Sequence, residues 1–548
     1  MSTLLHVENL RTTLRSAGKE IKAVDDVSFK IEKGETFCLV GESGSGKSIT
    51  ALSLIQLLPD HVVTHLSGTI DFDWRQQDDK HTNVDMMRLD EPQLRQIRGS
   101  RIAMIFQEPM TSLNPVFTIG DQIIEALQLH HPEMSEAEAK TKALTALKQV
   151  QIPKAEQRFD NYPHQLSGGQ RQRVMIAMAL VGEPDLLIAD EPTTALDVTV
   201  QAEILKLMRD LQERIGMSIL FITHDFGVVA QIAHHVGVMK QGKLVEVGET
   251  KQLLQKPQHL YSQKLLASLP ENLPKPNKVE SNDSESLIEI KNLKVWFPIK
   301  KGLLQRTVDH VRAVDDVDLS IHKGQIMALV GESGCGKTTL GRSLLQLEKP
   351  TAGSIRMDGH ELTSLSNKEL RQWRPKMQIA FQDPQSSLNP RLLIVTTLTE
   401  PMKVHGIGAT QEERIELAGK VLESVHLKRE FLWRYPHEFS GGQRQRIGLA
   451  RALVLHPEFI VCDEITSALD VSVQAEILQL LLELRQMNDL TLLFITHNIG
   501  VVEYLSDETV VMYKGKIVER GKTADVCGNP QQDYTQKLLS AVPRMNVY

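Results

Sequence analysis

The sequence contains a long internal repeat, and this duplication limits the possible folds more than any other feature. The segment Tyr162–Arg173 (YPHQLSGGQRQR) returns almost unchanged as Tyr435–Arg446 (YPHEFSGGQRQR). Three other pairs of residues keep the same interval: Asp190 and Asp463, His224 and His497, Tyr261 and Tyr534. Solenoid repeats are only about 20–50 residues long, so a repeat of this length is a whole domain that has been copied. We therefore expect two similar domains in one chain.

The boundary between the copies is a polar segment, residues 271–286 (ENLPKPNKVESNDSES). It is rich in Pro, Asn, Ser and charged residues and has few apolar side chains, so it cannot form a core and is typical of a flexible linker. We predict a first domain at residues 1–270 and a second domain at residues 287–548.

The composition is that of an ordinary globular protein and excludes several classes. The 548 residues are 41% hydrophobic and 24% charged, and the formal net charge of -7 gives no overall attraction to nucleic acid. The longest apolar run, Val174–Val181, is far shorter than the roughly 18 residues that a membrane span needs. Residues Met1–Arg11 lack the basic and apolar pattern of a secretory signal. The four cysteines are widely separated, which argues against a zinc site and favours a reducing compartment.

Within each copy, short apolar runs alternate with segments of helical period. Residues Thr36–Val40, Leu186–Ala189 and Ile219–Ile222 are expected as buried strands. Helices are expected at Lys47–Leu58 and Val198–Arg214. Strands that alternate with helices in this way favour an α/β domain whose sheet is largely parallel.

A glycine-rich loop follows a predicted strand and precedes a predicted helix in both copies. Its sequence is GESGSGKS at residues 41–48 and GESGCGKT at residues 331–338, and both match the phosphate-binding pattern GxxxxGK[ST]. Glycines allow the left-handed backbone that turns several N–H groups toward phosphate oxygens. Lys47 and Lys337 would neutralise the β- and γ-phosphates, and the Ser48 and Thr338 hydroxyls would reach Mg²⁺. The sequence therefore predicts two nucleotide-binding sites.

Each copy also has an acidic pair at the end of an apolar run. Four apolar residues precede Asp190 and Glu191 in the first copy and Asp463 and Glu464 in the second. The Asp would hold Mg²⁺ directly or through water, and the Glu would polarise an attacking water. A buried strand with an acidic end would look the same in isolation, but its occurrence with a phosphate loop in both copies favours the catalytic interpretation.

Further motifs narrow the prediction to one family. The segments Leu166–Gln170 (LSGGQ) and Phe439–Gln443 (FSGGQ) lie shortly before the acidic pairs. Glutamines in FQEP or FQDP, aspartates in ALD and histidines in FITH complete the set: Gln107 and Gln382, Asp197 and Asp470, His224 and His497. This constellation resembles ATP-binding cassette (ABC) proteins over nearly all of both copies. The resemblance implies two tandem P-loop NTPase domains, each with a RecA-like core, an antiparallel β subdomain and a helical subdomain that carries the signature.

The resemblance also implies roles for individual residues, with each ATP lying between the phosphate loop of one domain and the signature segment of the other. Two glutamates would be general bases and two histidines would position the γ-phosphate: Glu191, Glu464, His224 and His497. The implied Mg²⁺ ligands are Ser48, Gln107, Asp190, Thr338, Gln382 and Asp463. The implied ATP-binding residues are Gly41, Glu42, Ser43, Gly44, Ser45, Gly46, Lys47, Ser48, Gln107, Ser167, Gly168, Gly169, Gln170, Phe297, Gly331, Glu332, Ser333, Gly334, Cys335, Gly336, Lys337, Thr338, Gln382, Ser440, Gly441, Gly442 and Gln443.

Two positions depart from the family pattern. The aromatic residue that stacks on adenine is Phe297 in the second domain, but Leu14 stands at the equivalent position of the first. The first site is therefore expected to bind ATP more weakly. Glu464 is followed by Ile465 where the first domain, like most of the family, has Pro192. This substitution would allow the backbone after the catalytic Glu to shift.

A narrower resemblance concerns the transported solute. Three pairs of segments resemble the peptide-uptake branch of bacterial importers: residues 106–115 and 381–390, the YPH lead-ins at 162–164 and 435–437, and residues 261–266 and 534–539. Two fused cassettes are similar to the glutathione-type and microcin-peptide-type ATPases. The resemblance implies ATP and Mg²⁺ as cofactors, a peripheral location at the cytoplasmic face of the bacterial inner membrane, two integral-membrane permease subunits and, indirectly, a solute-binding protein. Only Cys527 lies where many relatives carry a cysteine cluster, so no iron–sulfur cluster is expected.

Other functions fit parts of the pattern. A soluble tandem cassette that acts on nucleic acid or ribosomes would carry a long charged linker or zinc cysteines and a basic balance, none of which is seen here, so no nucleic-acid partner is expected. An exporter is disfavoured because exporters usually fuse the membrane domain to the cassette. Members of the same branch also import nickel, so the choice of peptide is an inference from analogy.

Overall fold

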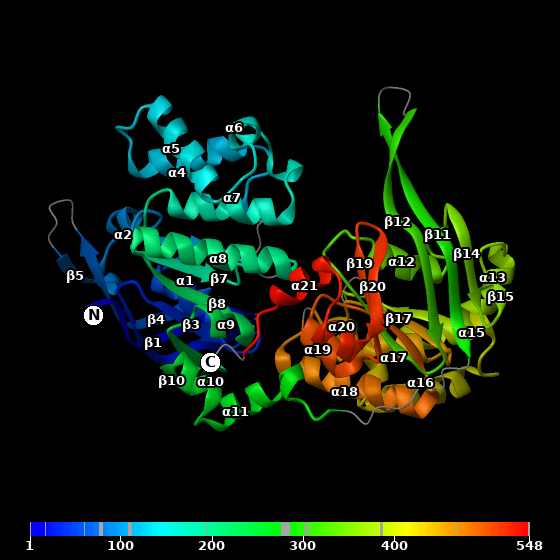
Figure 1. Ribbon diagram of the computed structural model, residues 1–548. Helices are drawn as coiled ribbons and strands as arrows, with labels where there is room; N and C mark the ends of the chain where they lie inside the picture. Colours follow the sequence, from blue (N-terminus) through cyan, green and yellow to red (C-terminus); the bar gives the residue numbers. More distant parts are fainter. Residues whose placement is uncertain are drawn as a thin grey trace. The chain divides into compact units, whose positions relative to one another are not determined.

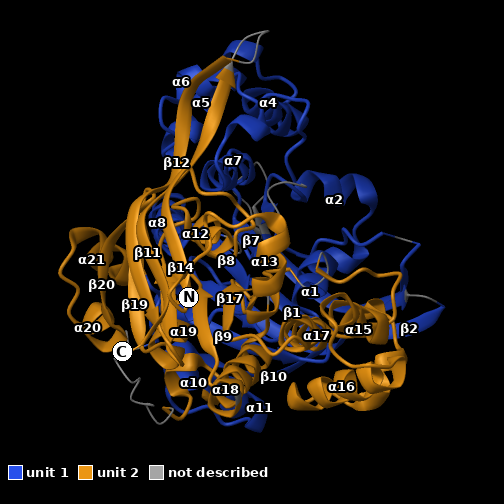
Figure 2. Ribbon diagram, turned by 90° about the vertical axis from the view of Figure 1, so that its right-hand side faces the viewer, with its two compact units in different colours: residues 1–266, 542–548 blue, residues 267–541 orange. Residues whose placement is uncertain are grey.

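The chain forms two compact units, residues 1–266 with 542–548 and residues 267–541, each containing one copy of the repeat (Figure 2). The computed structural model describes residues 2–16, 18–59, 61–75, 81–107, 112–193, 196–275, 285–301, 306–383, 387–467 and 469–545.

Unit 1 begins with a β-hairpin, and a strand, the phosphate loop and a helix follow it (Figure 1). Its strands are β1 (Thr3–Ser16), β2 (Lys19–Glu32), β3 (Thr36–Val40), β4 (Val63–Arg75), β5 (His81–Asp85), β6 (Ile102–Ile105), β7 (Leu186–Asp190), β8 (Ser218–Thr223), β9 (His235–Lys240) and β10 (Lys243–Glu249). Its helices are α1 (Lys47–Leu54), η1 (Met86–Arg88), α2 (Glu91–Ile97), α4 (Ile119–His130), α5 (Glu136–Gln149), α6 (Ala155–Arg158), η2 (Pro163–Gln165), α7 (Gly168–Leu180), α8 (Val198–Ile215), α9 (Phe226–Ile232), α10 (Thr250–Gln255) and α11 (Leu260–Ala267).

Unit 2 repeats this order. Its strands are β11 (Ser286–Lys301), β12 (Arg306–His322), β13 (Ile326–Val330), β14 (Ala352–Met357), β15 (His360–Glu361), β16 (Met377–Ala380), β17 (Phe459–Asp463), β18 (Thr491–Ile495), β19 (Glu508–Tyr513) and β20 (Lys516–Lys522). Its helices are η3 (Pro270–Asn272), α12 (Lys337–Leu344), α13 (Asn367–Trp373), η4 (Arg374–Lys376), α15 (Ile394–His405), α16 (Gln411–Ser424), η5 (Arg429–Trp433), η6 (Pro436–Glu438), α17 (Gly441–Leu453), α18 (Val471–Asn488), α19 (Ile499–Leu505), α20 (Thr523–Gly528) and α21 (Asp533–Ser540).

The domain limits of the structure differ from the predicted ones at both ends of unit 2. Helix η3 packs on α19, and Leu273 is buried in the core of unit 2, so the first residues of the predicted linker belong to the packed structure of that unit. Residues 542–548 group with unit 1. The middle of the predicted linker, residues 276–284, lies outside the described residues, and its flexibility stays a prediction.

Each unit is built on a six-stranded sheet that is parallel except at one edge. The order is β10-β9-β3-β8-β7-β6 in unit 1 and β20-β19-β13-β18-β17-β16 in unit 2, with the first strand of each order antiparallel to its neighbour. Strands β3, β7 and β8 are buried along their whole length, as expected for parallel strands that are covered on both faces. The predicted α/β fold with a largely parallel sheet is confirmed.

An antiparallel sheet accompanies each parallel one. The order is β2-β1-β4-β5 in unit 1 and β12-β11-β14-β15 in unit 2. In unit 1, Leu5 and Ile31 of this sheet share one core with Phe37 and Leu39 of β3. The antiparallel β subdomain is therefore joined to the parallel sheet through buried side chains and places β1 and β2 next to the phosphate loop.

Helices α4, α5 and α7 form a group that projects from the sheet in unit 1, as Figure 1 shows, and α15, α16 and α17 are their counterparts. The signature segments open α7 and α17, with Ser167 and Ser440 at the cap positions. This confirms the predicted helical subdomain. No helix among the described residues is long and apolar enough to cross a membrane.

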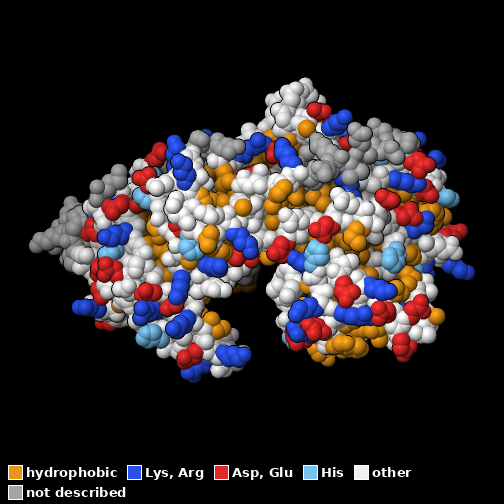
Figure 3. Space-filling view, turned by 90° about the horizontal axis from the view of Figure 1, so that it is seen from below, with side chains coloured by type: hydrophobic (Ala, Val, Ile, Leu, Met, Phe, Trp, Pro, Cys, Tyr) orange, Lys and Arg blue, Asp and Glu red, His pale blue; other side chains and the backbone are white. Residues whose placement is uncertain are grey.

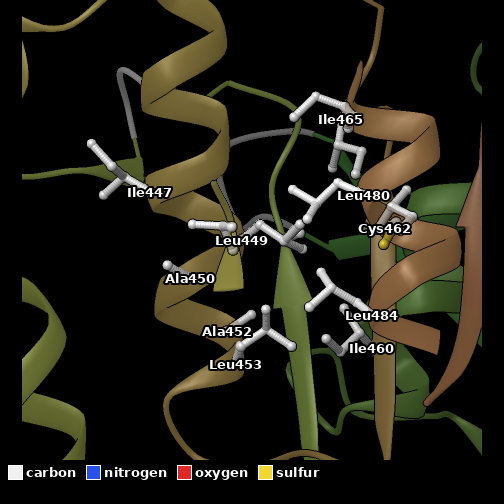
Figure 4. Close-up of a cluster of buried hydrophobic side chains, with 14 of the residues drawn as sticks. Ile447, Leu449, Ala450, Ala452, Leu453, Ile460, Cys462, Ile465, Leu480 and Leu484 are labelled. Carbon is white, nitrogen blue, oxygen red and sulfur yellow. The ribbon is translucent and has the colours of Figure 1, made fainter. Parts of the chain in front are cut away.

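The core of unit 2 explains how Ile465 is accommodated. Side chains of α17, β17 and α18 meet in a buried cluster that includes Cys462, Leu480 and Ile465, which is 2% exposed (Figure 4). The φ angle is 46° at Glu191 and 48° at Glu464. Ile465 thus packs inward, and Glu464 has a left-handed φ like that of Glu191, while a shift of the backbone after Glu464 stays a prediction.

The predicted elements are recovered with small differences at their ends. Strand β3 has the predicted limits, but α1 ends at Leu54 and not at Leu58. The reason is that Gln56 has a φ of 49°, and the Leu57 N–H turns back to the Leu52 carbonyl. Such a left-handed residue after the last turn is a common helix stop.

On the face shown in Figure 3, basic and acidic side chains intermingle.

Candidate functional site

The phosphate loops connect β3 to α1 and β13 to α12. Gly46 has a φ of 103° and Gly336 has a φ of 110°. Residues with a Cβ rarely adopt such positive φ angles. A Cβ at either position would also overlap a backbone carbonyl, that of Ala23 in unit 1 and that of Ala313 in unit 2. Strands β2 and β12 thus pass so close to the loops that only glycine fits.

The lysines of both loops are buried and held by loop carbonyls. Lys47 Nζ donates to the carbonyls of Gly41 at 2.8 Å and Glu42 at 3.0 Å. Lys337 Nζ makes the same two bonds, to Gly331 at 2.8 Å and Glu332 at 2.9 Å. An ammonium group has three donors, and two of them are fixed here by the loop backbone. The backbone of the first two loop residues therefore sets where the positive charge lies.

A hydroxyl and a carboxylate meet beside each loop. Ser48 Oγ donates to Asp190 Oδ1 at 3.0 Å, and Thr338 Oγ1 donates to Asp463 Oδ1 at 3.0 Å. Burial raises the pKa of both aspartates, so a neighbouring cation would stabilise their charged forms. Within the described chain no three His, Cys, Asp or Glu side chains gather as a metal site. The hydroxyl–carboxylate pair fits Mg²⁺, because this ion takes few protein ligands and fills its shell with phosphate and water.

The remaining catalytic candidates converge on the glutamate that follows each aspartate. Gln107 Nε2 donates to Glu191 Oε2 at 3.0 Å, and His224 Nδ1 lies 3.3 Å from Glu191 Oε1. Both candidate glutamates have positive φ angles, which are uncommon for residues other than glycine and cluster at functional sites. Unit 2 has the same arrangement, with 2.9 Å from Gln382 Nε2 to Glu464 Oε2 and 3.6 Å from His497 Nδ1 to Glu464 Oε1.

The ionised form is favoured for the histidine of the pair in unit 1 and for the glutamate of the pair in unit 2. Burial of His224 opposes its protonation, but the carboxylate of Glu191 outweighs this effect and raises the pKa of the imidazole. In unit 2, interaction with His497 holds the pKa of Glu464 below its usual range. A carboxylate that stays ionised can accept a proton from water, which is what a general base requires. The assignment of Gln107 and Gln382 as Mg²⁺ ligands stays a prediction, since their amide nitrogens contact the glutamates.

The signature segments lie at exposed helix starts. Ser167 Oγ accepts from the Gln170 N–H at 3.3 Å, and Ser440 Oγ accepts from Gln443 in the same way at 3.3 Å. A Cβ at Gly169 would lie 2.7 Å from Val200, whereas a Cβ at Gly168 would meet nothing within 4 Å. Packing within unit 1 therefore requires the second glycine and not the first. The first leaves the positive end of a 13-residue helix open to an anion.

The adenine-stacking candidates lie on the hairpin beside each phosphate loop. Phe297 is 40% exposed, and its partner on the neighbouring strand is Val311. Val311 is two residues before Ala313, whose carbonyl lies against the phosphate loop of unit 2. Leu14 occupies the equivalent place in unit 1 and pairs with Ile21. The structure confirms that the two positions are equivalent, and the role in stacking stays a prediction.

Some predicted segments cannot be placed, and one contact was missed. Parts of the predicted motifs lie outside the described residues. They are residues 108–111 after Gln107, residues 384–386 after Gln382 and the alanines of the two ALD motifs. Tyr261 and Tyr534 contact the phosphate loops of their own units, and no motif predicted these two contacts. Their recurrence at one interval was the available signal.

Comparison with known proteins identifies the family. The model of the ABC transporter family matches residues 24–194 and 314–467, which together are more than half of the chain. The chain belongs to the ABC transporter ATP-binding family. It is accordingly an ATPase that is coupled to transport, and its two ABC domains are the two repeats described above.

Several relatives of this ABC ATPase match over nearly its whole length. The peptidoglycan transport ATP-binding protein YejF of Agrobacterium fabrum is 49% identical over 544 residues, which is 98% of this chain and 96% of that protein. The glutathione import ATP-binding protein GsiA of Escherichia coli K12 is 46% identical over 564 residues, 98% of this chain and 89% of that protein. Among solved structures, the ATP-binding cassette MJ0796 bound to ADP and phosphate is 29% identical, with a TM-score of 0.40 over 45% of this chain and 99% of that chain.

Proposed function

We propose that this ABC ATPase is the motor of a bacterial importer for peptides. The observation that carries the proposal is a second match, to the C-terminal region of oligopeptide and dipeptide transporters, which occurs twice, at residues 245–293 and 518–547. Each match follows a complete set of candidate catalytic residues. The names of the relatives point to glutathione and to peptidoglycan as solutes, both of which contain peptide bonds.

The geometry supports a definite role for each group in ATP hydrolysis. Lys47 would neutralise the β- and γ-phosphates from a position fixed by the Gly41 and Glu42 carbonyls. The Ser48 and Asp190 oxygens would hold Mg²⁺, which would neutralise the charge that develops on the phosphates. Glu191 would take the proton of the attacking water, and Gln107 and the His224 imidazole would orient that carboxylate. The equivalent groups of unit 2 would act in the same way.

Each site would be completed by the signature segment of the other unit. The support within each unit is the exposed start of α7 or α17, where the first glycine is not needed for packing. A backbone that carries no side chain there, at the positive end of a helix, is suited to a γ-phosphate. Two composite sites would follow, with Ser440 serving the Lys47 site and Ser167 serving the Lys337 site.

ABC import subunits work with membrane permeases and substrate-binding proteins. Two permeases, a solute-binding protein and a peripheral position at the cytoplasmic face are the finer part of the proposal. We call residues 107–115 and 382–390 the Gln loops. The residues that follow them support a docking role, because Val116 and Phe117 are 71% and 52% exposed. Buried Gln122 holds this loop through the carbonyls of Asn114 and Phe117, each at 3.1 Å. An apolar surface held by a buried side chain is typical of a contact with a partner.

Reconstitution tests the proposed function. The chain, its permeases and its solute-binding protein are placed in vesicles, and ATP hydrolysis and uptake are measured with short peptides, glutathione or nickel salts. We expect peptides to be taken up and to stimulate hydrolysis, and Lys47→Ala with Lys337→Ala to abolish both because both phosphate clamps are lost. Uptake of nickel without any peptide would contradict the assigned cargo, and hydrolysis by the double variant at the wild-type rate would contradict the assigned sites.

A further inference from the structure

In both halves, the last strand of the sheet (β10 or β20) and the two helices after it lie against their own unit. We call residues 243–267 and 516–540 the C-terminal arms. In the first arm, Glu246 accepts the backbone N–H groups of Gln258 at 2.7 Å and His259 at 3.1 Å. In the second, Glu519 accepts those of Gln531 at 2.7 Å and Gln532 at 3.2 Å. Equivalent carboxylates, Glu246 and Glu519, therefore hold the backbone just before α11 in unit 1 and just before α21 in unit 2.

Each anchored helix carries a tyrosine that reaches the phosphate loop. Tyr261 is 8% exposed, and its hydroxyl donates to Glu42 Oε2 at 3.0 Å. The Tyr534 hydroxyl accepts the backbone N–H of Glu332 at 3.1 Å. Glu42 and Glu332 are the second residues of the two loops. Their carbonyls are the ones that accept from Lys47 and Lys337, so each tyrosine contacts a residue that holds the phosphate-binding lysine.

The surroundings of the two tyrosines differ. Lys240 Nζ lies 4.6 Å from the centre of the Tyr261 ring. In unit 2 the equivalent residue is Tyr513, whose ring centre is 4.2 Å from that of Tyr534. Burial raises the pKa of the Tyr534 phenol, which keeps the hydroxyl protonated. Tyr261 thus lies beside a charged side chain, whereas Tyr534 lies beside another aromatic ring. In both units the tyrosine contacts the second residue of the phosphate loop.

We propose that Tyr261 and Tyr534 are positioning residues that tie each C-terminal arm to the phosphate loop of its own unit and raise the affinity for nucleotide phosphates. The lysine ammonium group donates a hydrogen bond to the carbonyl of Glu42 in unit 1 and of Glu332 in unit 2. A hydrogen bond from the tyrosine that restrains this glutamate therefore also restrains the ammonium group. Binding is reciprocal, and ATP therefore stabilises the arm to the extent that the arm stabilises bound ATP. The proposal rests on the proposed roles of Lys47 and Lys337, and it is independent of the solute that is transported.

The first test is nucleotide titration of the full-length chain, with the other phosphate loop disabled by Lys337→Ala or Lys47→Ala. Tyr261→Phe, read in the Lys337→Ala chain, and Tyr534→Phe, read in the Lys47→Ala chain, each remove one hydroxyl. We expect ATP to bind about three- to tenfold more weakly. Binding of AMP, which has no β- or γ-phosphate, should be unchanged. Tyr513→Phe in the Lys47→Ala chain is the matched control, because it keeps the ring beside Tyr534, and it should leave ATP affinity unchanged.

A parallel loss of ATP and AMP affinity would show a merely structural role and overturn the proposal, as would unchanged ATP affinity in both tyrosine variants. The lysine variants separate this outcome from a failure of the assigned sites. If Lys47→Ala and Lys337→Ala together do not weaken ATP binding, the site assignment fails. If they weaken it and the tyrosine variants do not, only the positioning role fails.

A second test detects the coupling directly. Backbone hydrogen exchange of residues 260–267 is followed with and without ATP in the Lys337→Ala chain. ATP should increase the protection of α11, and Tyr261→Phe should abolish this increase. A double-mutant cycle with Glu42→Gln adds a check, since both changes act on one hydrogen bond and their effects on ATP affinity should be less than additive. An ATP-dependent protection that persists in Tyr261→Phe would refute the link.

Discussion

Exchanging the residues at the two adenine positions should reverse the order of the two ATP affinities. Leu14→Phe supplies an aromatic ring to unit 1, and Phe297→Leu removes the ring from unit 2. Both residues lie on the first strand of equivalent hairpins, and the residue paired with each is two positions before the alanine whose carbonyl abuts the phosphate loop. The exchange therefore alters the stacking surface and leaves the phosphate contacts in place.

The exposed surface of Phe297 limits the size of the effect. An aromatic side chain has about 200 Å² of surface, and Phe297 is 40% exposed, which leaves roughly 80 Å² open to a base. Covering all of it would contribute at most about 2 kcal/mol at about 25 cal/mol per Å². Leucine at this position would recover part of this contribution. We expect a net difference of about 0.5–1.5 kcal/mol, or roughly two- to tenfold in affinity.

Titration with ATP, one site at a time, measures this difference. Site one is read in a Lys337→Ala chain and site two in a Lys47→Ala chain. Site one should be the weaker, Leu14→Phe should tighten it, and Phe297→Leu should weaken site two by a similar factor. Inorganic triphosphate, which has no base to stack, serves as a comparison for the phosphate contribution, and its affinity should not change in either variant. Equal affinities of the two parent sites, or a Leu14→Phe chain that binds ATP no better, would refute the stacking argument.

Three other predictions follow from the proposed sites and surfaces. Ser440→Arg, in unit 2, should reduce ATP turnover at the Lys47 site, since it would place bulk where the γ-phosphate is bound; normal turnover there would contradict the composite arrangement. Glu191→Gln with Glu464→Gln should bind ATP at wild-type affinity but release no phosphate, as measured by nucleotide retention and phosphate assay, and rapid release would contradict the general-base role. Phe117→Glu and Arg391→Glu, at exposed positions after the Gln loops, should reduce uptake in vesicles while basal hydrolysis stays intact; loss of both activities would indicate misfolding instead.

The chemistry of this chain was predictable because it depends on short motifs whose spacing is tied to strand ends. Thr36–Val40 is apolar and is followed at once by the glycine-rich loop, so the strand, the loop and the start of α1 at Lys47 could all be placed. The Ser48–Asp190 contact follows because β3 and β7 are parallel strands on either side of β8, and parallel strands of one sheet end at the same edge. Each of these motifs occurs twice in the chain, in the same order.

What sequence analysis missed depends on contacts between distant segments. The bond between Tyr261 and Glu42 joins residues 219 positions apart, and no local pattern reports such a pair. The same is true of the packing of Ile465. Its side chain lies in a core with residues of α17 and α18, which the motif could not predict. The end of α1 was placed too late, because a left-handed glutamine gives no composition signal as strong as that of glycine.

The positions at which the two units differ give a final indication of how the chain works. The distances that matter for phosphate chemistry are nearly equal, with 3.0 Å for both hydroxyl–aspartate contacts and 2.8 Å for both bonds from lysine to the first loop carbonyl. The differences lie elsewhere. Exposed Val116 and Phe117 correspond to Arg391 and Leu392, and Gln122, which clamps that loop in unit 1, corresponds to Thr397. The two candidate phosphate sites thus share one geometry, whereas the exposed residues after Gln107 and Gln382 differ in chemistry. If these residues meet permeases as proposed, we expect an apolar partner surface opposite Val116 and Phe117 and an acidic one opposite Arg391.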